Sequence, residues 1–164
     1  CELREVAVPD GVAEIPEAAF DCCSRLRTVA FGEHSKLEKI GPDAFAHTAL
    51  EEFVAPRALR EIGAGAFRMC EGLRRVVLNE GLEILGKEER AENGGEYPGV
   101  FQESGLRRVR FPSTLKKIEY DTFIGCEKLK SVSLPEGLEY IGKYCFAGAG
   151  LESVVLPASL RTIT

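Results

Sequence analysis

The residues that could perform acid–base or metal chemistry are few and scattered. The two histidines, His34 and His47, belong to no His-x-x-x-His or His-x-Glu pattern and have no cysteine at metal-binding spacing. The sequence contains no Gly-x-Ser-x-Gly, no phosphate-binding P-loop, and no Gly-x-Gly-x-x-Gly after a strand. We therefore expect no catalytic, cofactor-binding or metal-binding residues, and we interpret the chain as a non-enzymatic protein.

Six cysteines supply the other reactive groups. The sequence consists of repeated units, described below, and three of the cysteines occupy the same position in every second unit: Cys23, Cys70 and Cys126. If neighbouring repeats lie about 4.8 Å apart, these thiols are about 10 Å from one another, whereas the Cα atoms of a disulfide lie within roughly 7 Å. We interpret the three, and also Cys145, as small buried side chains. A bond from Cys1 to the Cys22–Cys23 pair stays an alternative.

These residues belong to a sequence that repeats a leucine-led unit about every 23 residues. The opening leucines are Leu3, Leu26, Leu50, Leu73, Leu106, Leu129 and Leu151. A fixed period in the twenties is typical of a solenoid, in which each unit buries its apolar face against its neighbours. We therefore predict one domain over residues 1–164 with about six and a half repeats, and we expect it to be part of a longer chain.

Each unit predicts a short strand, a corner and a turn. The pattern Leu-x-x-Val-x-Leu alternates apolar and polar residues, as a strand with one buried face does. Proline follows in five units, as at Pro135, and ends the strand because it has no N–H for the ladder. The corner glycine, as at Gly142, is predicted to adopt backbone angles that other residues resist. We expect the segment around the next phenylalanine, such as 16–20, to form a short helical turn.

Two irregularities interrupt the period. The distance from the phenylalanine to the next leucine alternates between six and five residues, with a cysteine in the longer version. We infer that the true repeat is a pair of turns. The fourth unit carries about ten extra residues, which we place in an insertion at 87–100. This polar, glycine-rich stretch is expected to be exposed, as a tolerated surface loop or as a binding element.

The outward-facing strand positions identify a candidate binding surface. In units four to six, these positions gather Arg74, Arg75, Arg107, Arg108, Arg110 and Lys130. Val54 and Val77 are the apolar contacts that we expect beside them. Like charges on adjacent strands destabilise a sheet, and an acidic partner would relieve that repulsion. The simpler interpretation is that long basic side chains extend into water over their own stems and block aggregation.

Composition narrows the class of partner. Acidic residues outnumber basic ones by 26 to 21, and the net charge of −5 argues against a general nucleic-acid-binding protein. No stretch approaches the roughly 18–20 apolar residues of a membrane span. We therefore expect a protein partner, with no nucleic acid and no membrane span in this segment.

The unit L-x-x-V-x-L-P-x-x-L-x-x-I-G-x-x-A-F-x-x-C-x-x-L resembles the BspA-like, Treponema pallidum-type class of leucine-rich repeats along the whole chain. It is nearly complete in 50–73 and 106–151, whereas Gly32 and Asn79 replace the proline and Glu119 replaces the corner glycine. The resemblance implies an α/β repeat solenoid, mostly β and loop by content. Its form would be a right-handed leucine-rich-repeat superhelix with a concave parallel sheet and short helical or 3-10 turns.

The same resemblance implies a function. Members of this class look like surface proteins of bacteria and protists, are often adhesins that bind host or partner proteins, and are not enzymes. We therefore expect a protein–protein interaction module that binds through its concave face, at a cell surface or outside the cell. The alternative is a structural or scaffold subunit of a large multi-protein assembly, located inside a cell or an organelle; a fold alone does not decide between them.

Overall fold

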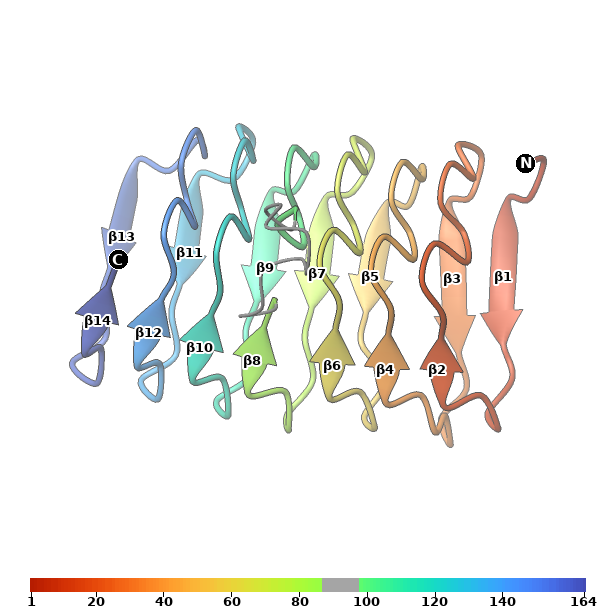
Figure 1. Cartoon of the computed structure of the whole chain (residues 1–164), viewed down its shortest axis with the longest axis horizontal. Coiled ribbons are helices and arrows are strands. Elements are labelled where there is room, and N and C mark those ends of the chain that lie inside the picture. Colours follow the sequence, from red (N-terminus) through yellow and green to blue (C-terminus); the bar gives the residue numbers. More distant parts are fainter. Residues whose placement is uncertain (87–97) are drawn as a thin grey trace, which may run out of the picture.

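The computed structural model describes residues 1–86 and 98–164, which wind into a parallel β-solenoid (Figure 1). Each turn of the solenoid, called a coil below, carries one longer strand and one two-residue strand. The longer strands are β1 (Glu5–Val8), β3 (Thr28–Phe31), β5 (Glu52–Val54), β7 (Arg75–Val77), β9 (Arg108–Arg110), β11 (Ser131–Ser133) and β13 (Ser153–Val155). The two-residue strands are β2 (Glu14–Ile15), β4 (Lys39–Ile40), β6 (Glu61–Ile62), β8 (Ile84–Leu85), β10 (Lys117–Ile118), β12 (Tyr140–Ile141) and β14 (Thr162–Ile163).

The two kinds of strand form two sides of the solenoid, which we call the long-strand side and the short-strand side (Figure 1). On the long-strand side, the hydrogen-bonded groups are β1–β3, β5–β7–β9 and β11–β13. On the short-strand side, they are β2–β4–β6 and β8–β10–β12–β14. All pairs are parallel, and each joins equivalent repeat positions, as in Val76 with Val109 and Ile118 with Ile141. The register read from the repeat is therefore confirmed for these strands.

The repeat positions stack to form the core. Leu50 and Leu73 are fully buried, as are Ile40 and Ile118. Burial of such a side chain contributes about 1.5–3 kcal/mol. Rings from successive coils lie 5.3 to 5.5 Å apart with planes within 14° of parallel, in the order Phe20, Phe45, Phe67, Phe101, Phe123 and Phe146. The predicted fold class, a leucine-rich-repeat solenoid made mostly of strand and loop, is confirmed.

The segments around the phenylalanines differ from the expected helical turns. The described residues contain no helix, and these segments are runs of turns that close the third side of each coil. In the second coil, the N–H groups of Asp43, Phe45 and His47 donate to carbonyls of the next coil at 2.9, 2.9 and 3.1 Å. Asp43 and His47 adopt left-handed backbone angles, with φ of 51° and 54°. A helix would use these N–H groups internally, so the ladder to the neighbouring coil replaces it.

The corner glycines are required mainly by close packing. Of the four at Ile-Gly or Leu-Gly corners, only Gly86 has a positive φ, of 95°. A Cβ atom on Gly63 would lie 2.5 Å from the backbone N of Pro42, and one on Gly41 would lie 2.6 Å from that of Glu17. The prediction of special backbone angles is therefore wrong for most corners: successive coils approach too closely there to admit a side chain.

Most of the predicted insertion at 87–100 lies outside the described residues, which resume at Pro98. Phe67 and Phe101, on either side of it in the sequence, stack at 5.5 Å like the other pairs. Within residues 1–86 and 98–164, no helix is long and apolar enough to cross a membrane.

Candidate functional site

The long-strand side gathers basic side chains on the fourth to sixth coils. We call the following set the basic face: Arg74, Arg75, Arg107, Arg108, Arg110 and Lys130. All six are exposed. Arg75 of β7 pairs in register with Arg108 of β9, and the N–H of Arg107 donates to the carbonyl of Arg74 at 3.0 Å. The structure therefore brings together, on adjacent strands, the basic residues that the repeat aligned.

One member of the basic face is neutralised within the chain. Arg75 Nη1 forms an ion pair with Glu52 Oε1 on the neighbouring strand β5. In the part of the chain that the structure describes, the other five form no ion pair. Glu80 lies near Arg110, but its carboxylate accepts hydrogen bonds from the N–H and hydroxyl of Ser113. These bonds, and the charge of Arg110, lower the pKa of Glu80.

The short-strand side also carries charged residues but arranges them differently. Along successive coils, one row reads Glu38, Arg60, Glu83, Lys116, Glu139 and Arg161. In the adjacent row, Lys39 Nζ lies 3.4 Å from Glu14 Oε1 and 3.9 Å from Glu61 Oε1. Opposite charges therefore alternate coil by coil on this side, whereas like charges accumulate on the basic face.

A groove adjoins the basic face at the first of the two interruptions in the ladder of long strands, between β3 and β5. β3 and β5 belong to different hydrogen-bonded groups, and a hollow of about 430 Å³ lies there. Its lining residues are Arg27, Thr28, Val29, Glu51, Glu52 and Val54. Val54 is 51% exposed, while Val77 is half-buried beside Arg110. The sequence did not reveal the groove, because the repeat pattern continues unchanged through the break.

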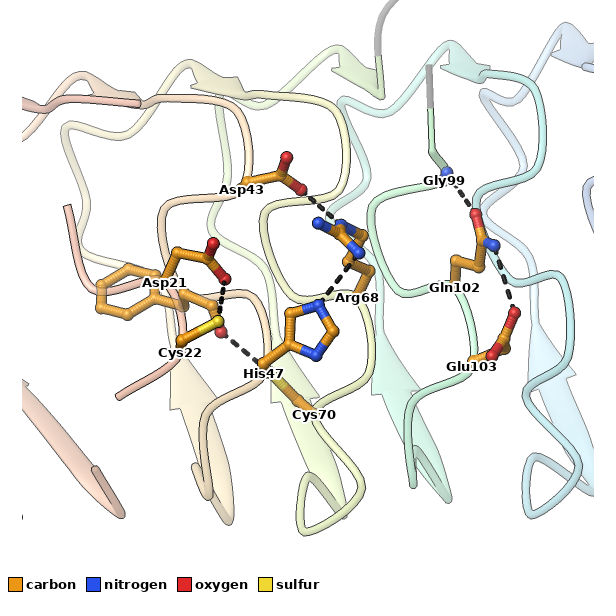
Figure 2. Close-up of polar contacts among 10 residues, drawn as sticks. Asp21, Cys22, Asp43, His47, Arg68, Cys70, Gly99, Gln102 and Glu103 are labelled. Atoms are coloured by element: carbon orange, nitrogen blue, oxygen red, sulfur yellow. Dashed lines mark hydrogen bonds and ion pairs between the residues drawn. The ribbon is translucent and has the colours of Figure 1, made fainter. Parts of the chain in front are cut away.

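A polar network on the turn side, the third side of each coil, links two successive coils through residues that the sequence did not associate (Figure 2). Arg68 Nε donates to Asp43 Oδ1 at 2.6 Å, and Arg68 Nη1 lies 3.0 Å from His47 Nε2. Because a guanidinium can only donate, Nε2 of His47 must accept, and its ring proton lies on Nδ1. The hydrogen bond to Asp43 raises the pKa of Arg68. His47 is thus engaged in a structural contact. Its partner, Arg68, lies about one repeat length further along the sequence, and this spacing is the sequence feature that could have predicted the contact.

Cys70 and Cys126, which occupy the same position of the repeat, are buried and hydrogen-bonded. Cys70 Sγ donates to the carbonyl of Phe45 at 3.1 Å and lies 3.3 Å from Thr48 Oγ1. Cys126 Sγ makes the equivalent contact with the carbonyl of Phe101 at 3.0 Å. Burial raises the pKa of both thiols, so neither is an activated nucleophile. The interpretation as packing residues agrees with this environment.

The remaining cysteines are also free in this structure. Cys145 is buried, and desolvation raises its pKa. Cys1 and Cys22 are exposed, and the hydrogen bond from Cys22 Sγ to Asp21 Oδ1, 3.5 Å long, raises the pKa of Cys22 (Figure 2). Over the two described ranges, no group of three or more His, Cys, Asp or Glu side chains is placed to hold a metal ion.

Comparisons with known proteins agree with this architecture. A family model described as the BspA type leucine rich repeat region matches in six copies over residues 1–89 and 97–164. A leucine-rich repeat protein from Bacteroides ovatus is 26% identical with a TM-score of 0.71, over 96% of this chain and 44% of that one. The T. pallidum leucine rich repeat protein is 26% identical with a TM-score of 0.58, over 96% and 60%.

A third solved structure is a leucine rich cell surface protein from Faecalibacterium prausnitzii, which is 24% identical with a TM-score of 0.58. The alignment covers 96% of this chain and 42% of that one, and at this identity it supports the fold alone. The chain thus spans less than half the length of the Bacteroides and Faecalibacterium proteins. No curated protein matches the sequence.

Proposed function

Because the chain belongs to the BspA-type leucine-rich repeat family, we propose that it is a non-enzymatic module that binds a partner protein through its long-strand side. One observation carries the proposal. On the short-strand side, charges of opposite sign alternate from coil to coil, and Lys39 lies between Glu14 and Glu61, whereas the basic face gathers charges of one sign, five of them without an ion pair among the described residues. Exposed charge that served solubility alone would not need this asymmetry.

Photo-crosslinking tests which side meets the partner. A photoreactive phenylalanine analogue is placed at Ser131 or Ser133, two exposed serines of β11 on the long-strand side. Matched controls carry it at Glu38 or Glu83, which are exposed on the short-strand side. In cells that express the protein naturally, we expect a discrete crosslinked band from the serine positions and not from the controls. Equal crosslinking from both sides, or from the controls alone, would refute the proposal.

Placement at a cell surface or outside the cell is part of the same proposal. Its support is the resemblance to a class whose members look like surface proteins, together with the similarity in fold to a cell surface protein from Faecalibacterium prausnitzii. Protease treatment of intact cells is the direct check. We expect an epitope-tagged full-length protein to be cleaved without lysis, and protection from the protease would contradict surface exposure.

A further inference from the structure

Building on the proposed function, we propose that the basic face recognises a short acidic segment of the partner protein, and that Glu52 competes with this segment for Arg75. The first support is geometric. Arg75 and Arg108 pair in register on β7 and β9, and Arg110 pairs with Val77 two residues further along. Adjacent strands lie about 4.8 Å apart, so guanidinium groups are presented at close intervals. A guanidinium binds a carboxylate through two parallel N–H donors.

The ends of the basic face limit the length of the segment. Glu51 and Glu52 lie on the third coil, and Glu152 lies on the seventh, so carboxylates flank the cations on both sides. The fourth to sixth coils span about two strand spacings, roughly 10 Å. An extended peptide advances about 3.3 Å per residue, so three to four acidic residues cover this distance.

The same boundaries argue against a long polyanion. A sulfated polysaccharide or a nucleic acid carries charge along its whole length and would meet the flanking carboxylates. The outward positions of the seven longer strands carry no aromatic side chain on which a base could stack. Val54, 51% exposed beside the groove between β3 and β5, instead suits an apolar residue next to the acidic run.

Glu52 occupies the position of a ligand carboxylate. It reaches Arg75 from β5, the strand that borders the basic face, and forms the ion pair described above. Both side chains are about half exposed, at 46% for Glu52 and 55% for Arg75, so the pair can open without unfolding the coil. Removing the charge of Glu52 therefore frees Arg75 and removes a repelling carboxylate, and it should strengthen binding of an acidic segment.

Fluorescence anisotropy with a labelled probe peptide tests both parts. The probe carries one leucine followed by a run of about four glutamates, matching the estimated span. We expect Arg108→Glu/Arg110→Glu to weaken binding about tenfold or more, because charge reversal replaces attraction with repulsion. Lys116→Glu/Arg161→Glu changes the net charge equally on the short-strand side and should alter binding less than about twofold. Circular dichroism confirms that each variant stays folded.

Glu52→Gln tests whether Glu52 competes with the peptide for Arg75. Breaking an exposed ion pair changes affinities by about two- to fivefold, and we expect tighter peptide binding by that factor. An unchanged affinity would overturn the competition by Glu52. The proposal as a whole is overturned if the probe does not bind, if both double variants weaken it equally, or if heparin-type oligosaccharide or single-stranded DNA binds the unaltered chain more tightly. Crosslinking from Ser131 and Ser133 would still stand in those cases, so the proposed function and the partner chemistry fail separately.

Discussion

Replacing Phe67 by alanine tests whether the phenylalanine stack holds the coils together. The side chain is fully buried, and its ring lies 5.5 Å from both Phe45 and Phe101 and 4.6 Å from Phe53. A Phe→Ala change in a core costs about 3–5 kcal/mol. Each lost ring pair is worth about 0.5–1.5 kcal/mol beyond area burial. Because three pairs are lost, we expect a destabilisation near 5 kcal/mol, comparable to the whole stability of a marginal domain.

Phe20→Ala is the matched control, because it removes the same group from the first coil. Phe20 is half-buried and stacks on one ring, that of Phe45, at 5.3 Å. We expect a loss of about 2 kcal/mol, less than half of that at Phe67. Urea unfolding followed by circular dichroism gives the free energy of unfolding and its dependence on denaturant for both variants.

The comparison between the two variants refutes or supports the reasoning. If they lose the same free energy within about 0.5 kcal/mol, the central stack is not what couples the coils. An unfolding curve of Phe67→Ala that separates into two transitions would support it in a stronger form, since a solenoid can unfold in parts when one nearest-neighbour contact is lost.

Three further predictions concern pH, packing and thiol reactivity. Hydrogen bonds lower the pKa of Glu80 below its ordinary value of 4.5, so its stabilising contribution is present above that pH and is lost as the pH falls through the lower folded-state value. The melting temperature of Glu80→Gln should therefore fall less than that of the unaltered chain on acidification below pH 4.5. Gly63→Ala should lower the free energy of unfolding by about 2 kcal/mol or more because its Cβ meets backbone, whereas Gly11→Ala, with nothing within 4 Å, should be nearly neutral in urea titrations. Native-state labelling with a thiol reagent should modify Cys22, and Asp21→Ala should accelerate that labelling by removing the hydrogen bond that raises the thiol pKa; an unchanged rate would contradict this cause.

The core and the strand register could be predicted from the sequence because the same pattern of apolar residues recurs in every unit. Leu73, Val76 and Ile62 recur at fixed offsets, and a buried apolar residue at each recurrence is sufficient to stack one coil on the next. The turn side could not be read in this way. Its hydrogen bonds join different coils, so a small-residue segment that tolerates a helix forms a ladder instead once a neighbouring coil is present.

The candidate site was predictable in position but not in its charge balance. Aligning units placed Arg75 beside Arg108, and the structure pairs them in register. Glu52 forms an ion pair with Arg75, whereas the cations beyond Arg75 form none in the described coils. This difference depends on side-chain conformations, which a repeat pattern does not encode. The groove beside Val54 likewise lies where β3 and β5 do not pair. No residue pattern in these two units distinguishes them from units whose strands do pair.

At one position on the turn side, coils with a cysteine alternate with coils with a hydroxyl residue, so the structural repeat is a pair of coils. Cys70 meets Thr48 of the preceding coil, and Cys126 meets Ser104 in the same way. Excising the third coil alone would set Thr48 next to Ser104 and place two short connections in succession. Excising or copying two neighbouring coils would preserve both the contacts and the alternation in length. Arrays whose coil numbers differ by two should therefore fold alike, and duplications in the gene are expected to persist when they add coils in pairs.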